Sequence, residues 1–278
     1  GMPPRIAIPV PHSGDSEYAE RALPQYERAV EMAGGTPVRI PLHQTPGEIM
    51  RLIEHCDAVL LPGSRADVDP AKYDAPRNPH TAEADSKRDS VDELLLQDAY
   101  NMHKPILGIC YGLQILNVYR SGTLIQHIES RIDHEAGKKV PIAHTVEIDP
   151  TSRLAKITGP APPAAESPER DGSSRVPGSG RNSRTPAAEE DSLILPVNSS
   201  HHQSADIIGD GLRAVARCPG DGIVEAVEGI SPDHFVLAVQ WHPERSVEED
   251  ESSRAIFKAL IEEANSSRAK LAGRSDAS

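Results

Sequence analysis

The sequence of 278 residues lacks a long apolar run. A helix that spans a membrane needs about 18 or more consecutive apolar residues, and no stretch of this chain approaches that length. The strand-like segment at residues 4–10 is too short to act as a signal sequence. We therefore expect no membrane partner and a cytoplasmic location.

Basic residues are scarce relative to acidic ones. The chain has 29 Lys and Arg against 42 Asp and Glu, which gives a formal net charge of −13. No run of Lys and Arg stands out that could follow a phosphate backbone. We therefore expect no nucleic-acid partner.

Cysteines are few, and their spacing is uninformative. Cys56, Cys110 and Cys218 are an odd number with no C-x-x-C pair, which argues against a disulfide framework and against a structural zinc site. A lone cysteine is most often a small buried apolar side chain, and this is our interpretation of Cys56 and Cys218. Cys110 has a different context.

Short apolar runs alternate with segments of helical period in the first half of the chain. This alternation predicts an α/β fold, a three-layer, open and mostly parallel sheet with helices on both faces. The predicted strands are Ile6–Val10, Val38–Ile40, Ala58–Leu61 and Ile106–Ile109, and the predicted helices are Glu17–Ala33, Pro46–His55, Ser90–His103 and Gly112–Tyr119.

Beyond Gly122 the predicted strands are shorter and suggest a small antiparallel extension. They are Thr123–Ile125, His144–Ile148, Leu212–Ala216 and Ile223–Val227. A further predicted strand, Phe235–Gln240, and a closing helix at Ser252–Ala264 follow them. Residues 159–192 are rich in Pro, Gly, Ser and charge, which predicts a disordered insertion. Residues 266–278 resemble a flexible tail. We interpret residues 1–278 as one domain.

Cys110 lies where a predicted strand turns into a predicted helix, in the run Gly108-Ile109-Cys110-Tyr111-Gly112. The nucleophile elbow of serine hydrolases has the same layout, with glycines making room for an exposed and rigid nucleophile. The thiolate is the reactive form of cysteine, and a helix N-terminus stabilises it. The sequence therefore predicts a thiol nucleophile at Cys110.

A candidate base follows the last predicted strand, in Gln240-Trp241-His242-Pro243-Glu244. An imidazole can hold a thiolate as an ion pair and later protonate a leaving amine, and a carboxylate can fix its tautomer. We expect His242 and Glu244 to fill these roles. By analogy with the elbow, backbone N–H groups of Tyr111 and Gly63 would form the oxyanion hole.

These motifs resemble the class I glutamine amidotransferase superfamily and, within it, the gamma-glutamyl-gamma-aminobutyrate hydrolases. Further segments match in the same order, and the resemblance spans most of the chain: Leu61-Pro62-Gly63-Ser64, Arg88-Asp89, Val197-Asn198-Ser199-Ser200-His201-His202-Gln203 and Asp221-Gly222-Ile223-Val224-Glu225-Ala226. The resemblance implies a flavodoxin-like sheet and cleavage of a gamma-glutamyl amide through a thioester on Cys110, with no cofactor.

The resemblance also implies that Gln114, Asn198, Ser199 and His201 surround the gamma-glutamyl head of a small-molecule substrate. Arg88 either faces a substrate carboxylate or pairs at the surface with Asp85 or Asp89. Many relatives carry Arg where this chain has Tyr111, so its ring is expected to alter the pocket wall. The leaving amine stays open.

The pair His201-His202 could suggest a metal site, but the sequence has no third ligand at the spacing of a zinc site, so we expect no metal site.

Two candidate functions fit the sequence. One is a self-contained gamma-glutamyl hydrolase, which we prefer, and the other is a glutaminase subunit that delivers ammonia to a synthetase partner. Homo-oligomerisation stays open.

Overall fold

A computed structural model describes residues 1–160 and 192–276 of the chain. These residues form a central sheet of nine strands. The strand order is β2-β1-β3-β4-β11-β10-β9-β6-β7. The first five strands in this order pair in parallel, and the four pairings from β11 to β7 are antiparallel. The predicted α/β class is confirmed, and the antiparallel part joins the same sheet.

Four of the parallel strands are short, apolar and almost wholly buried, as expected for strands covered by helices, whereas the edge strand β2 is only partly buried. They are β1 (Arg5–Pro9), β2 (Thr36–Ile40), β3 (Ala58–Leu61), β4 (Ile106–Ile109) and β11 (Val236–Val239). The antiparallel strands are β6 (His144–Ile148), β7 (Leu193–Val197), β9 (Leu212–Arg217) and β10 (Val224–Gly229). A separate pair is formed by β5 (Leu124–Ile125) and β8 (Ser204–Ala205).

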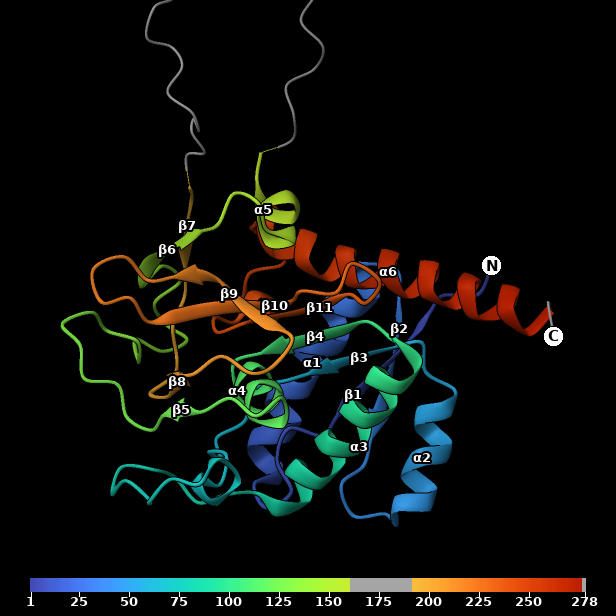
Figure 1. Cartoon of the computed structure of the whole chain (residues 1–278), viewed down its shortest axis with the longest axis horizontal. Helices are drawn as coiled ribbons and strands as arrows, with labels where there is room; N and C mark the ends of the chain where they lie inside the picture. Colours follow the sequence, from blue (N-terminus) through green and yellow to red (C-terminus); the bar gives the residue numbers. More distant parts are fainter. Residues whose placement is uncertain (161–191, 277–278) are drawn as a thin grey trace, which may run out of the picture.

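Helices cover both faces of the sheet, as Figure 1 shows with α6 along one face and α2 and α3 along the other. One apolar cluster joins α1 (Ser16–Met32), α5 (Arg153–Thr158) and α6 (Glu251–Asp276) to the sheet. The other joins α2 (Pro46–Glu54), α3 (Ser86–Met102) and α4 (Tyr111–Tyr119). Short 3₁₀ turns occur at Pro70–Tyr73 and Pro243–Arg245.

Side-chain caps define several helix starts. Asp85 accepts a hydrogen bond from the Arg88 amide, so α3 begins at Ser86, four residues before the predicted start. Thr45 and Glu48 form a capping box at the start of α2. Such caps satisfy amides that have no partner within the helix.

The prediction of a flexible tail from residue 266 is wrong for residues 266–276, because α6 continues to Asp276. Ala269, Lys270 and Leu271 favour a helix, and Arg268 donates a hydrogen bond of 2.7 Å to the Met2 carbonyl. Most of the predicted insertion, residues 161–191, lies outside the described residues.

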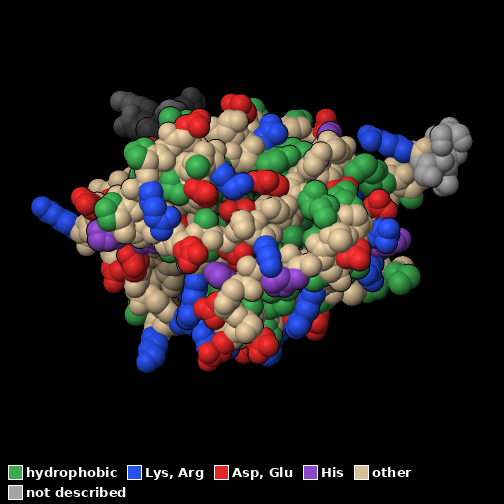
Figure 2. Space-filling view, turned by 90° about the horizontal axis from the view of Figure 1, so that it is seen from below, with side chains coloured by type: hydrophobic (Ala, Val, Ile, Leu, Met, Phe, Trp, Pro, Cys, Tyr) green, Lys and Arg blue, Asp and Glu red, His purple; other side chains and the backbone are tan. Residues whose placement is uncertain are grey.

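On the face that Figure 2 shows, acidic and basic side chains are interspersed. Among the described residues, no helix is both long and apolar enough to cross a membrane.

Candidate active site

Cys110 occupies the corner between β4 and α4. Its backbone has φ 55° and ψ −105°, a conformation that a non-glycine residue adopts only under strain. Its amide donates a 2.8 Å hydrogen bond to the Val239 carbonyl of β11, which anchors the corner to the sheet. A Cβ on Gly112 would overlap the Leu61 backbone, so glycine lets α4 approach β3 closely. The corner thus holds the thiol in one place at a helix N-terminus.

His242 follows β11 and reaches the same corner. Its Nδ1 lies 2.7 Å from Glu244 Oε2, which leaves Nε2 free to face the thiol. Asn198 clamps the His242 backbone through a 2.8 Å bond to the His242 amide and a 2.9 Å bond to its carbonyl. The structure therefore brings Cys110, His242 and Glu244 together, and their part in catalysis stays a prediction.

The three side chains perturb one another's ionisation. Burial alone would raise the pKa of Cys110, but the charge and hydrogen bond of His242, together with the charge of His201, lower it below its usual value. Burial opposes the charged form of His242, but Glu244 and Cys110 outweigh it and raise its pKa to about 9. A thiolate and imidazolium pair is favoured between these two pKa values.

The Pro62–Gly63 peptide is fixed on both sides. Its carbonyl accepts a 2.6 Å hydrogen bond from Arg88 Nη2, and its N–H donates a 3.0 Å bond to the Tyr26 hydroxyl. Gly63 therefore lies at the corner as predicted, but its amide already has a partner in α1. Burial and the nearby Glu244 charge raise the pKa of Tyr26 well above its usual value, so the hydroxyl stays neutral.

Arg88 is fully buried and does not face a substrate carboxylate or form a surface pair. Its Nε binds Asp92 at 2.8 Å, and its Nη1 binds the Pro11 carbonyl at 2.8 Å. Both open interpretations of Arg88 are thus wrong, because the guanidinium ties α3 to the loops after β1 and β3.

The Tyr111 ring points away from the pocket. Its hydroxyl donates to Asp89 Oδ1, and Arg88 lies over the ring with its Cζ 4.8 Å from the centroid. Burial and the charge of Asp92 raise the pKa of Asp89 to about 7. The expectation that this ring forms a pocket wall is wrong. The Tyr111 amide belongs to the first turn of α4, where amides have no helical partner.

A pocket of about 290 Å³ opens at the thiol. Gln114 and His201 border it together with Cys110, as the resemblance implies. Asn198 and Ser199 do not: Asn198 braces His242, and the Ser199 hydroxyl donates to the His134 carbonyl at 2.9 Å. The remaining lining residues are Ser64, Arg65, Ala66, Asp67, Glu135, Ser200, His202 and Gln203.

Sequence reasoning missed Tyr26 and the network behind His201. Tyr26 lies on the apolar face of a helix, so the sequence alone does not show that its hydroxyl reaches the active site. Glu225 is fully buried beside His201, with its Oε2 3.4 Å from His201 Nε2. A glutamate inside an apolar strand, Val224 to Val227, is the one signal that could have drawn attention to it.

The chain belongs to the Peptidase C26 family, whose model matches residues 10–244. It is 29% identical to the gamma-glutamyl-gamma-aminobutyrate hydrolase PuuD of Escherichia coli K12, over 85% of this chain and 84% of that protein. It is 32% identical to the glutamine amidotransferase-like protein YvdE of Lactococcus lactis, over 81% of both chains. The family implies a cysteine-type hydrolase.

One relative is longer than this chain. The Mycobacterium tuberculosis protein Rv2859c is 32% identical over 86% of this chain but only 66% of its own length. Among solved structures, PurLQS from Thermotoga maritima aligns with a TM-score of 0.54 and 18% identity, over 94% of this chain and 99% of that one. A protein from Thermoplasma acidophilum, described as a GMP synthase subunit, aligns with a TM-score of 0.60 and 14% identity, over 98% of both chains. These two similarities show the fold.

Proposed function

We propose that this protein is a self-contained hydrolase of gamma-glutamyl amides that acts through a thioester on Cys110. The observation that carries the proposal is the juxtaposition of the strained Cys110 corner with the His242–Glu244 pair. The relatives named as gamma-glutamyl-gamma-aminobutyrate hydrolases support the gamma-glutamyl half of the substrate. The leaving amine is a small amino-acid or polyamine group.

In the acylation step, the Cys110 thiolate attacks the carbonyl carbon of the amide. The Tyr111 amide at the start of α4 stabilises the oxyanion that develops. His242 then gives its Nε2 proton to the departing nitrogen, so the C–N bond breaks and a neutral amine leaves. Glu244 keeps the imidazole oriented and stabilises its charged form.

In the second step, the neutral imidazole accepts a proton from water as the water oxygen attacks the thioester carbonyl. The C–S bond breaks, glutamate leaves, and the thiolate and imidazolium pair is restored. The Gly63 amide can serve as a second oxyanion donor only if it exchanges the Tyr26 hydroxyl for the substrate oxygen.

The test is turnover of gamma-glutamyl-gamma-aminobutyrate and gamma-glutamyl-p-nitroanilide by the purified protein alone. We expect both to be cleaved by the wild type and neither by Cys110→Ala. Cys56→Ala is the matched control, since Cys56 is buried beside Leu52 away from the pocket, and it should keep full activity. Activity of Cys110→Ala near that of the wild type would refute the mechanism.

A protein that hydrolyses glutamine only in the presence of a synthetase would favour the ammonia-delivering alternative. That result would be consistent with the thioester mechanism on Cys110, but it would contradict the proposal that the protein acts without a partner.

A further inference from the structure

Four ionisable side chains from separate segments converge behind the pocket. His134 lies between β5 and β6, His144 begins β6, His201 follows β7, and Glu225 is in β10. His134, His201 and Glu225 are at most 5% exposed, and Glu225 is fully buried. The thioester mechanism gives none of the four a proton to transfer, although His201 borders the pocket and its charge lowers the pKa of Cys110.

Five buried atoms of this cluster have no hydrogen-bond partner among the described residues. They are His134 Nδ1, His144 Nε2, His201 Nε2 and both carboxylate oxygens of Glu225. Buried polar atoms are rarely left without a partner, because desolvation then goes uncompensated. Glu225 Oε2 has only ion-pair contacts with His134 and His201, so the cluster keeps unused hydrogen-bonding capacity for a ligand.

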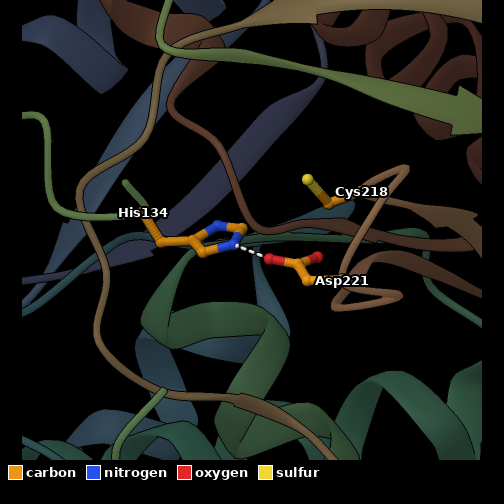
Figure 3. A group of neighbouring side chains, drawn as sticks. All are labelled: His134, Cys218 and Asp221. Atoms are coloured by element: carbon orange, nitrogen blue, oxygen red, sulfur yellow. Dashed lines mark hydrogen bonds and ion pairs between the residues drawn. The ribbon is translucent and has the colours of Figure 1, made fainter. Parts of the chain in front are cut away.

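The other nitrogen of each histidine is held by an acceptor. His134 Nε2 lies 2.7 Å from Asp221 Oδ2, and Figure 3 shows the opposite ring nitrogen turned away from that carboxylate. His144 Nδ1 lies 3.0 Å from the Thr145 carbonyl, and His201 Nδ1 lies 2.8 Å from the Gln203 carbonyl. Histidines that bind metals almost always donate their second N–H to a carboxylate or carbonyl in this way.

The distances suit a small cation. One ligand atom from each of His134, His144 and Glu225 lies within 4.8 Å of the others. Glu225 Oε2 is 3.7 Å from His134 Nδ1 and 3.4 Å from His201 Nε2. A tetrahedral ion with metal–ligand distances of about 2.0–2.1 Å separates its ligands by about 3.4 Å.

We infer that His134, His144 and Glu225 form a binding site for a divalent transition metal of the zinc class. Imidazole nitrogens with one carboxylate suit zinc, whereas magnesium and calcium prefer oxygen ligands. Three protein ligands leave one position of a tetrahedral ion for water. The metal ties β6 and β10 to the segment of His134, whose neighbour Glu135 lines the pocket.

A neighbouring group offers an alternative ligand set. His134, Cys218 and Asp221 also have ligand atoms within 4.8 Å of one another (Figure 3). In that set Asp221 already pairs with His134 Nε2, at 2.7 Å. We assign the ion to the histidine and glutamate set, because its facing atoms are the unpartnered ones.

The test is a titration of the full-length, chelator-treated protein with zinc chloride, followed by calorimetry and thermal unfolding. We expect one equivalent to bind and to raise Tm. Glu225→Gln and His144→Ala should each weaken binding at least about 100-fold, and Asp221→Asn about 10- to 100-fold, as for a residue that orients a ligand. His55→Ala removes an exposed histidine far from the cluster and should change nothing.

Cobalt chloride supplies a readout that does not depend on the variants folding. The wild-type complex should show the visible absorption of four-coordinate cobalt without a thiolate charge-transfer band, and Cys218→Ser should leave the spectrum unchanged. A thiolate band, or loss of binding in Cys218→Ser, would overturn the ligand set. Failure of the wild type to bind zinc or cobalt above the level of nonspecific surface sites would mean that the cluster is an ion-pair network only.

The metal binding is measured without substrate, so its outcome is separate from that of the proposed function. A protein that binds zinc but cleaves no gamma-glutamyl amide would retain this site and lose the proposed activity.

Discussion

At the residue scale, the proposed chemistry gives His242 and Glu244 different roles, proton transfer for His242 and orientation of the imidazole for Glu244. In the proposed mechanism His242 carries protons in both steps, whereas Glu244 acts through its 2.7 Å contact with the imidazole. We expect His242→Ala to lower kcat by about 10⁴-fold or more and Glu244→Gln to cost at least about tenfold less. Steady-state kinetics with gamma-glutamyl-p-nitroanilide measures both. Equal losses would contradict an orienting role for Glu244.

The pH dependence of kcat/KM reports the same pair. Activity should rise with pH as Cys110 loses its proton, at a pKa below that of an ordinary thiol, because His242 stabilises the thiolate. It should fall above about pH 9, where His242 becomes neutral and cannot protonate the leaving amine. Since Glu244 raises the pKa of His242, Glu244→Gln should move the alkaline limb to lower pH. An alkaline limb that stays in place would contradict this assignment.

Gly63 has little room for a side chain. A Cβ at this residue would lie 2.9 Å from His242 Cε1 and 3.1 Å from the Tyr26 hydroxyl. We expect Gly63→Ala to displace the imidazole and lower kcat by about 10²-fold, as small misplacements of reacting groups do. Gly47→Ala is the control, because nothing lies within 4 Å of the added carbon. Unchanged kinetics of Gly63→Ala would show that the ring is free to move.

At the element scale, α3 is anchored by its buried Arg88. Removing the guanidinium in Arg88→Met leaves Asp92 buried without its partner and frees the carbonyls of Pro62 and Gly63. Breaking a buried ion pair on one side costs about 3–5 kcal/mol, so we expect a loss of this size in the free energy of unfolding. Urea denaturation measures it.

The control for this prediction is Arg39→Met, which breaks a pair with Glu27 whose arginine is 60% exposed. Exposed pairs contribute about 0–1 kcal/mol. Equal destabilisation by the two variants would contradict the anchoring role of Arg88.

Helix and strand positions were predictable where local patterns decide them. The predicted Glu17–Ala33 differs from α1 by one residue at each end, and the predicted Pro46–His55 differs from α2 by one residue at its C-terminal end. The start of α3 was missed because Arg88 and Asp89 look like loop residues, although both are buried. β7 was missed because Pro196 disfavours a strand, and it is tolerated only because β7 is an edge strand.

At the scale of the whole molecule, the site could be predicted only where contiguous motifs carry it. The grouping of Cys110, His242 and Glu244 was predictable because each belongs to a motif that suggests its chemistry in the sequence. The hydrogen bonds of Asn198 to His242 and of Gly63 to Tyr26 join segments far apart in the chain. The cluster around Glu225 likewise depends on how β6 and β10 pack, which spacing alone does not reveal.

The thioester on Cys110 is tested most directly by mass spectrometry of the wild-type protein, quenched with acid during turnover of gamma-glutamyl-p-nitroanilide. We expect intact protein heavier by one gamma-glutamyl group, a peptide map that assigns the adduct to Cys110, and its absence in Cys110→Ala. Turnover without any adduct on Cys110, or an adduct on Cys56 or Cys218 instead, would contradict the account.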